Sequence, residues 1–241
     1  MLIVRKTLSA RGSHGGSEES YLASTSDLMI GLLFVFIVMV VVLSMQLTKG
    51  IPDPRSELIG AIDEGLRTRG LDLKVNPRSG TLSLPADVLF DQGSYQLKAG
   101  GVETLATIRS EINTAIKCYL SDNITNPQCQ KINPQRALLE TIYVEGHTDK
   151  APVTKEGYNN WYLGLDRARS VYYSLINGEM ANYRNTSGQP IFGFSSYADE
   201  RPADPAQPDN FRLNRRVELR FVMAYRSRAS SVSQALDIDS R

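Results

Sequence analysis

The stretch "LLETIYVEGHTDKAPVTKEGYNNWYLGLDRARSVYYSLING" occupies residues 138–178 and combines two different patterns. Its first part, residues 138–149, predicts a strand that ends in a polar turn. Its last part, from Asn159, predicts a helix that Gly178 closes. A strand followed by a helix, with polar side chains between them, indicates a site at one end of a mixed α and β domain.

Two charged residues of this stretch are candidates for ligand binding. Asp149 stands at the end of the strand and Arg167 lies in the following helix, so the two side chains can face each other across one pocket. A carboxylate binds an ammonium group, and an arginine fork binds a carboxylate. A ligand that carries both groups on one carbon would be clamped. The alternative is an internal salt bridge between Asp149 and Arg167.

The surrounding sequence completes one domain, expected over residues 71–225. Residues 71–75 and 81–84 predict a hairpin, and residues 190–198 and 214–223 predict two further strands. Between the hairpin and the strand before Asp149, residues 97–120 have helical spacing, with apolar positions at Val102, Leu105, Ile108, Ile112 and Ile116. The order β-β-α-β-α-β-β predicts an α+β domain, in which helices cover one face of a mixed sheet.

A long apolar run precedes this domain. Residues 1–20 are polar and predict a flexible tail, and residues 21–48 predict a membrane-spanning helix, since Leu28–Leu47 contains no charge. The run is longer than the apolar core of a secretory signal and no small-residue cleavage site follows it, so an uncleaved anchor fits better. Arg5, Lys6 and Arg11 favour a cytoplasmic N-terminus, which places the C-terminal domain in the periplasm.

Residues 49–70 predict a short linker that contains an amphipathic helix. Pro54 suits the first turn, Gly70 suits the end, and four apolar residues share one face: Leu58, Ile59, Ile62 and Leu66. By position alone, this helix is a candidate plug for a channel. The Ser-rich residues 226–241 predict a disordered tail.

The composition excludes several functions and leaves one question on cysteine open. The net charge of +1 gives no signature for nucleic-acid binding. No phosphate loop, nucleophile elbow or histidine-rich motif is present, so we expect neither an enzyme nor a cofactor, and His14 and His147 match no metal-ligand spacing. Cys118 and Cys129 form a disulfide in an oxidising compartment or remain two free thiols.

Asp27, directly before the uncharged run, has three interpretations. It can cap the helix N-terminus, although Ser24, Thr25 and Ser26 suit that role equally. It can mark the end of the span in water. It can also be an ionisable group inside the membrane, which is a functional hypothesis by default. A helix that starts near Tyr21 places Asp27 about 9 Å along its axis.

The C-terminal motifs resemble the OmpA-like peptidoglycan-binding domain over roughly residues 84–222. The matching residues are Gly146-His147-Thr148-Asp149, Asn160, Leu163, Arg167-Ala168 and Asn214-Arg215-Arg216-Val217. The resemblance implies that Asp149 and Arg167 bind the diaminopimelate of the peptidoglycan stem peptide and that Thr148, Asn160, Leu163 and Arg215 line the site. We expect Arg216 to pair with an acidic neighbour and His147 to be a hydrogen-bonded turn residue. Gly164 departs from the usual Leu-Ser of this family.

The membrane segment resembles the helix of MotB-type stator subunits through Asp27, Leu28-Met29, Phe34, Phe36, Val38 and Met39. This resemblance implies a homodimer inside a ring of MotA-like subunits in the bacterial inner membrane, with Asp27 carrying protons or sodium ions. The short linker is most similar to ZorB of the Zorya anti-phage defence system, whose ring subunit is ZorA. Alternatives are a flagellar-type stator and a passive membrane-to-wall anchor. The Gly-His-Thr-Asp and Asn-Arg-Arg-Val motifs argue against a TolR- or ExbD-like subunit.

Overall fold

The computed structural model describes residues 16–48, 53–154 and 156–224, and the chain divides into two units, Met1–Ile51 and Pro52–Arg241. The first unit contains helix α1, Gly16–Thr48. The second contains all other elements, which are α2 Pro54–Thr68, β1 Lys74–Asn76, β2 Thr81–Pro85, α3 Ala86–Leu89, α4 Ala99–Ile116, η1 Lys117–Tyr119, η2 Ser121–Asn123, α5 Pro127–Ile132, β3 Leu139–His147, α6 Asn160–Leu175, η3 Gly178–Asn182, β4 Phe192–Ala198, α7 Phe211–Asn214 and β5 Arg216–Met223.

Helix α1 begins five residues before the expected start at residue 21. The sequence from Gly16 to Tyr21 contains two glutamates, and glutamate has a high helix propensity. Within α1, Thr25–Met45 is long and apolar enough to cross a membrane. The side chains of Ser26–Met45 are all exposed. Residues 1–15 of the expected tail, and residues 225–241 at the other end, lie outside the described residues.

Asp27 therefore lies further from the start of the helix than expected. It lies eleven residues beyond Gly16, about 16 Å along the axis rather than the expected 9 Å. It also lies two residues inside the apolar span Thr25–Met45, which is about 3 Å. Asp27 is thus well inside the helix, so it is not the N-cap, and it stands at one end of the apolar span.

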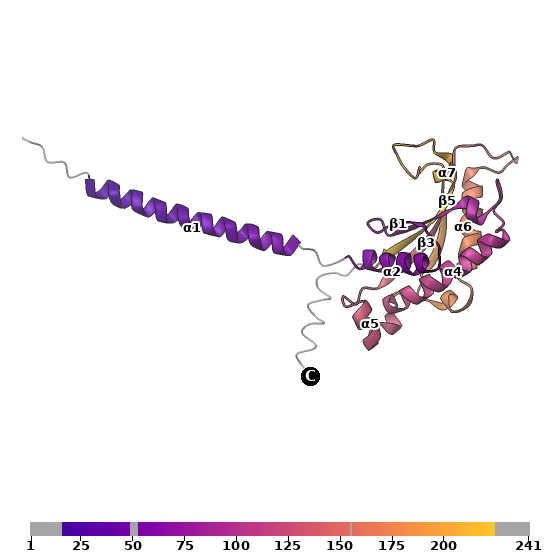
Figure 1. Ribbon diagram of the computed structural model, residues 1–241, viewed down its shortest axis with the longest axis horizontal. Helices are drawn as coiled ribbons and strands as arrows, with labels where there is room; N and C mark the ends of the chain where they lie inside the picture. The colour runs from indigo at the N-terminus through magenta and orange to yellow at the C-terminus, as the bar shows by residue number, and fades with distance from the viewer. Residues whose placement is uncertain (1–15, 49–52, 155, 225–241) are drawn as a thin grey trace, which may run out of the picture. The chain divides into compact units, whose positions relative to one another are not determined.

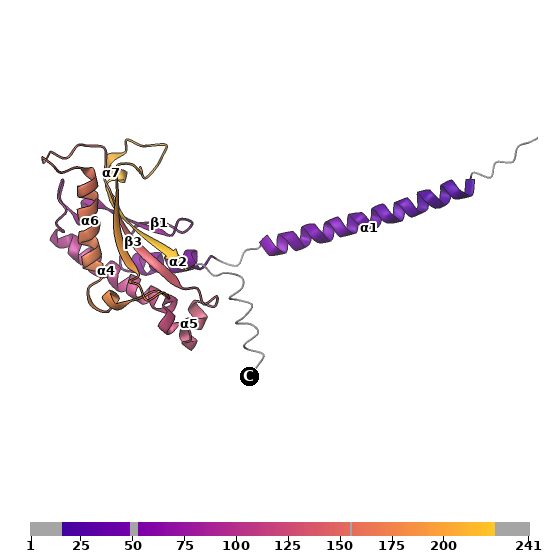
Figure 2. The same cartoon turned by 180° about the vertical axis from the view of Figure 1, so that it is seen from behind.

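The second unit contains a five-stranded sheet in the order β1-β2-β5-β3-β4. Strands β3 and β4 run parallel, while the pairs β1–β2, β2–β5 and β5–β3 are antiparallel. Helices α2, α4 and α6 lie against the same face of the sheet (Figures 1 and 2). This confirms the predicted fold class, an apolar N-terminal helix followed by an α+β domain with a mixed sheet covered by helices.

The core lies between this face of the sheet and the helices. Alternate residues of β5 point into it, and its Leu219 and Phe221 pair with Val144 and Ile142 of β3. These four side chains are fully buried, as expected for a half-buried strand with a period of two. Helix α4 confirms the helical spacing and contributes Leu105, Ile108, Ile112 and Ile116 to the core, whereas Val102 of the same helix is 49% exposed.

Helix α2 belongs to the domain, so the expected boundary at residue 71 is wrong. The four predicted apolar residues of α2 are all buried, at 0–1% exposure, in the same core as α4 and the sheet. Asp53 caps the helix by accepting a hydrogen bond from the Arg55 backbone N–H at 3.1 Å. Gly70 follows in the left-handed conformation, with φ of +79°. The predicted amphipathic helix is confirmed, and the apolar face of α2 packs on the core of its own domain.

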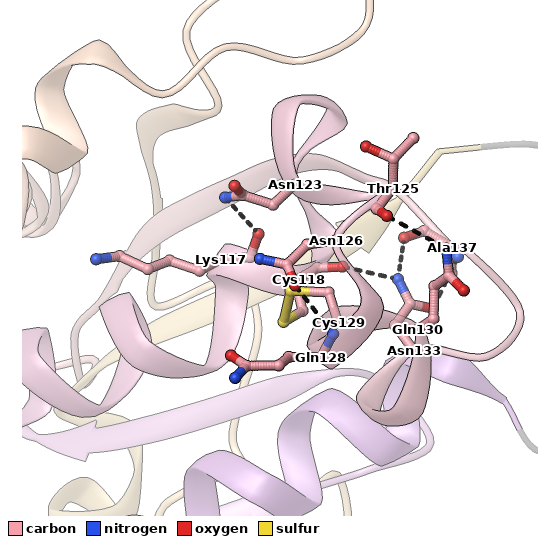
Figure 3. The surroundings of a disulfide bond; sticks show 10 residues. All are labelled: Lys117, Cys118, Asn123, Thr125, Asn126, Gln128, Cys129, Gln130, Asn133 and Ala137. Carbon is pink, nitrogen blue, oxygen red and sulfur yellow. Dashed lines mark hydrogen bonds between the residues drawn. A yellow bond between two sulfur atoms is a disulfide. The ribbon is translucent and has the colours of Figure 1, made fainter.

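The segment between α4 and β3 contains a disulfide between Cys118 and Cys129, whose Cα atoms are 4.9 Å apart (Figure 3). Helix α5 forms in this segment because Asn126 caps it and Pro127 suits its first turn. Buried Asn133 donates to the carbonyl oxygens of Cys118 and Ala137, at 2.9 and 2.7 Å. Helix α5 lies at the opposite end of the domain from α7 (Figures 1 and 2).

We predict that α2 is required for the stability of the domain. The substitution Ile62→Ala removes a side chain that is 1% exposed and should lower the unfolding free energy by about 2–5 kcal/mol. Glu64→Ala, on the exposed side of the same helix, is the matched control and should change it by less than about 0.5 kcal/mol. Urea denaturation followed by circular dichroism measures both. Equal effects of the two variants would show that α2 does not pack on the core.

Candidate functional site

The six residues predicted to form the binding site line one pocket of about 560 Å³. Thr148 and Asp149 directly follow β3, and Arg215 lies between α7 and β5. Helix α6 provides Asn160, Leu163 and Arg167. The remaining lining residues are Gln92, Gly93, Tyr95, Ala151, Pro152, Val153, Thr154, Tyr158 and Phe211. The structure therefore brings together residues that lie up to 123 positions apart in the sequence, from Gln92 to Arg215.

Asp149 is the acidic group of the pocket, and its side chain is 9% exposed. Its Oδ2 accepts a hydrogen bond from Arg215 Nη1 at 2.7 Å, and its Oδ1 accepts one from the Ala151 backbone N–H at 3.1 Å. The Asn160 side chain donates to the Asp149 carbonyl oxygen at 3.0 Å. These bonds hold the carboxylate at the end of β3, with one oxygen bound to a cation.

Arg167 is the most buried cation of the pocket, with 3% exposure. Its Nε donates to the Ser94 carbonyl oxygen at 2.9 Å, and its guanidinium lies 5.4 Å from the centre of the Phe90 ring. Burial lowers the pKa of Arg167, while the charge of Asp149 acts in the opposite direction. Among the described residues, no ion pair within 4.0 Å joins Arg167 to Asp149. The alternative of an internal salt bridge between them is therefore wrong, because Asp149 pairs with Arg215.

Thr148 adds a hydroxyl group without a partner. Thr148 is 2% exposed, and its Oγ1 makes no hydrogen bond to any described residue. Its backbone N–H donates to the Ala198 carbonyl oxygen at 2.8 Å, which fixes the residue between β3 and β4. A buried polar atom without a partner is costly and requires an explanation. A ligand group that hydrogen-bonds to Thr148 would provide it.

Three aromatic residues of the pocket, Tyr95, Tyr158 and Phe211, were not identified from the sequence. The Tyr158 hydroxyl donates to Asp166 Oδ2 at 2.7 Å, and burial together with this bond raises its pKa. The Tyr158 ring also stacks on Tyr162, with the ring centres 5.8 Å apart. No local pattern of the sequence places these three side chains in the pocket.

The pocket depends on a close contact between β3 and α6. A Cβ atom at Gly146 would overlap the backbone carbonyl of Gly164, and a Cβ atom at Gly164 would overlap Ser196 Oγ on β4. The departure from the usual serine at position 164 thus has a physical reason. The hydroxyl of Ser196 occupies the space that a side chain at 164 would need.

We predict that Gly146→Ala separates β3 from α6 and weakens the site. The new Cβ meets backbone atoms, which cannot move aside as a flexible side chain can. The unfolding free energy should fall by about 1–3 kcal/mol or more, and ligand retention should fall with it. Gly193→Ala, on the neighbouring strand β4, is the control, since its Cβ would lie at an ordinary 3.5 Å from Tyr143. If Gly146→Ala were as stable as Gly193→Ala, β3 and α6 would not be in close backbone contact at Gly146 and Gly164.

His147 lies next to the pocket, and its expected hydrogen bonds are absent. The residue is 1% exposed, and neither ring nitrogen has a partner among the described residues. Burial, followed by the charge of Arg216, lowers the pKa of His147 to about 4. The ring stacks on Tyr197, with the ring centres 5.5 Å apart. His147 is therefore a neutral, packed residue rather than a hydrogen-bonded turn residue.

An ion-pair network surrounds His147 on the sheet face opposite the helices. Arg216 donates to Glu218 at 2.7 Å, as expected for a structural arginine, and Arg220 binds both oxygens of Glu145. Glu145, His147 and Glu218 offer ligand atoms within 4.8 Å of one another, which is a possible metal geometry. The two arginines already neutralise both carboxylates, so a further double positive charge would be repelled. We interpret this cluster as structural.

We predict that His147 makes stability fall in acid. Its pKa is lower in the folded state than the usual 6.5, so the folded chain binds fewer protons between pH 6.5 and 4. The contribution is present above about pH 6.5 and is lost towards pH 4, by about 3 kcal/mol. His147→Phe keeps a ring and removes the titration, so its unfolding free energy should fall less over this interval. Parallel pH profiles for the two proteins would contradict the assignment.

A mixed sheet with helices on one face, and a charged pocket where a strand ends, define a ligand-binding α+β domain. A family model described as OmpA family matches residues 89–216. This match covers more than half of the chain, and the chain belongs to the OmpA family. The matched region leaves out α2, β1 and β2. No curated protein sequence matches the chain.

Several solved structures are similar to the domain. The periplasmic domain of Helicobacter pylori MotB is 23% identical, over 67% of this chain and 83% of that one, with a TM-score of 0.43. A putative MotB-like protein from Desulfovibrio vulgaris is 20% identical, over 72% and 98%, with a TM-score of 0.44. The cell wall anchor of the T6SS from Pseudomonas aeruginosa is 20% identical, over 71% and 99%, with a TM-score of 0.45. At these values the likeness does not specify a function.

Proposed function

We propose that the domain binds peptidoglycan through the diaminopimelate residue of the stem peptide. The observation that carries this proposal is one pocket with a carboxylate, Asp149, and a buried guanidinium, Arg167, that do not pair with each other. Diaminopimelate carries an ammonium group and a carboxylate on the carbon at the end of its side chain. Asp149 suits the first group and Arg167 suits the second. Thr148 Oγ1 and Asn160 supply neutral hydrogen-bonding groups, and Leu163 packs against the ligand's methylene groups.

Retention on isolated cell walls tests this proposal. The full chain in detergent should sediment with sacculi that contain diaminopimelate. Arg167→Ala should abolish retention, because the carboxylate of the ligand loses the one buried cation among the described residues of the pocket. Arg169→Ala is the matched control on the same helix, since Arg169 is half exposed and pairs with Asp166 on the surface.

The chemistry of the wall separates recognition of the clamped carbon from general adhesion. Sacculi with lysine in place of diaminopimelate lack the second carboxylate, so they should retain the protein more weakly. Equal retention by the two kinds of sacculi would refute recognition of diaminopimelate. Equal loss in Arg167→Ala and Arg169→Ala would show that any surface charge suffices.

The proposed role of the membrane unit is to carry ions in a stator-type motor complex of the bacterial inner membrane. Helix α1 has one span, Thr25–Met45, and Asp27 is the acidic residue within it. In this proposal two copies of the chain lie inside a ring of MotA-like subunits, and Asp27 takes up and releases protons or sodium ions. The domain fixes the complex to the wall, so ion flow turns the ring against a stationary part.

The disulfide supports a periplasmic location of the domain. Disulfides persist in oxidising compartments and are rare in the cytosol, and Cys118 and Cys129 form one here. A periplasmic domain after one span requires a cytoplasmic N-terminus, which agrees with the charges of Arg5, Lys6 and Arg11. On sequence resemblance we assign the chain to the ZorB type, with a ZorA ring and a role in anti-phage defence. A flagellar-type stator and a passive wall anchor are the alternatives.

We predict that Asp27→Asn abolishes ion flux and leaves wall binding intact. The amide is neutral and cannot exchange a proton, while its size preserves the helix. Flux is measured in cells that express the chain with its ring subunit, and retention is measured on sacculi. Asp27→Glu keeps the carboxylate and should keep part of the flux. Full function of Asp27→Asn would instead identify the chain as a passive anchor.

A further inference from the structure

We infer that Arg215 acts as an internal counter-cation that occupies the ammonium position on Asp149 and moves away when the ligand binds. This inference rests on the proposed function, because it concerns how the same pocket selects its ligand. It assigns to Arg215 a role opposite to the one first expected. Arg215 competes with the ligand for Asp149 and does not hold the ligand.

The first argument is the geometry at the Asp149 carboxylate. Oδ1 already accepts the Ala151 backbone N–H, and Oδ2 binds Arg215 Nη1 at 2.7 Å. An ammonium group that approaches Oδ2 meets the guanidinium of Arg215. Arg167 is the second cation that lines this pocket, after Arg215, so the ammonium group would be the third. A third cation beside one carboxylate is unfavourable, because like charges repel strongly where water is scarce.

The second argument is the unequal burial of the pair. The Asp149 side chain is 9% exposed, whereas that of Arg215 is 39% exposed. A buried carboxylate without a counter-ion is destabilising, so Asp149 requires a cation at all times. Arg215 loses less by leaving, since its guanidinium is partly solvated and makes one hydrogen bond among the described residues. The exchange of one cation for another keeps Asp149 neutralised throughout.

The third argument is that space and a carboxylate acceptor lie beside Arg215 for its displaced side chain. Arg215 also lines a neighbouring pocket of about 350 Å³, over the sheet face opposite the helices. Asp87 and Glu218 offer carboxylates in this second pocket. Glu218 is bound by Arg216 at 2.7 Å, but Asp87 has a loose contact with Arg212 at 3.7 Å. Asp87 is thus the acceptor most available to a displaced Arg215.

This arrangement makes the affinity for an ammonium group depend on the displacement of Arg215. A ligand with an ammonium group replaces Arg215 on Asp149 and binds with both charges paired. A ligand that has the carboxylate but lacks the ammonium group leaves Arg215 in place and gains one charged contact, at Arg167. The competition therefore lowers the affinity for every ligand that must displace Arg215, and a ligand without the ammonium group forgoes the charged contact with Asp149.

Calorimetry with two peptides and two variants of the full chain in detergent tests this inference. The first peptide is L-Ala–D-Glu–diaminopimelate–D-Ala, and the second has α-aminopimelate in place of diaminopimelate, so it lacks one ammonium group. Arg215→Gln should bind the first peptide about tenfold more tightly than the unsubstituted chain, which corresponds to about 1.4 kcal/mol. Its affinity for the second peptide should not rise. Arg169→Gln, an equal charge change on the exposed side of α6, should change neither affinity.

The outcomes are distinct. Weaker binding of both peptides by Arg215→Gln would show that Arg215 holds a carboxylate of the ligand. Unchanged binding, or an equal gain for both peptides, would also overturn the competition with the ammonium group. Failure of the unsubstituted chain to bind the first peptide would refute the proposed function itself.

A measurement on the unsubstituted chain covers the case in which Arg215→Gln does not fold. The side-chain ¹⁵N resonance of Arg215 should shift to that of a guanidinium freed from Asp149 when the first peptide saturates the pocket. The second peptide should leave this resonance in place. The same resonance with both peptides would overturn the inference.

Discussion

The contact between Gly146 on β3 and Gly164 on α6 fixes the geometry on which the pocket depends. The two backbones lie so close that a side chain at either position would overlap its neighbours. Asp149 follows Gly146 by three residues, and Arg167 follows Gly164 by three residues, one helical turn along α6. The contact therefore sets the separation between the acidic and basic groups of the pocket. A small shift of α6 would move Arg167 away from the carbonyl oxygen of Ser94 that orients it.

Local patterns in the sequence predict much of this structure. The spacing of Leu58, Ile59, Ile62 and Leu66 identified the buried face of α2, and the strand predicted over residues 214–223 contains β5. The six predicted pocket residues also lie together, because they belong to the end of one strand, the helix that follows and the start of β5. These features depend on periodicity within an element or on motifs at its ends, and both are visible in one stretch of sequence.

Partners that lie far apart in the sequence could not be predicted. Asp149 pairs with Arg215, 66 residues away, and Arg167 binds the carbonyl oxygen of Ser94, 73 residues away. An amphipathic pattern shows that α2 must cover an apolar surface, but it does not say which surface, so its place in the domain core was missed. The sequence also could not show that the polar side-chain atoms of His147 and Thr148 are buried without hydrogen-bond partners, because burial depends on the whole fold.

The place of α2 in the core has a consequence for the proposed anchoring function. Any pull from α1 enters the domain at α2, its first element, and α2 packs against β5. Strand β5 is the middle strand of the sheet, hydrogen-bonded to β2 on one side and to β3 on the other. Its first residue, Arg216, directly follows Arg215 of the pocket. One strand, held on both edges, thus connects the point where force enters with the site where the wall ligand would bind. A pull along β5 loads many hydrogen bonds at once, so the connection resists extension better than a flexible linker does.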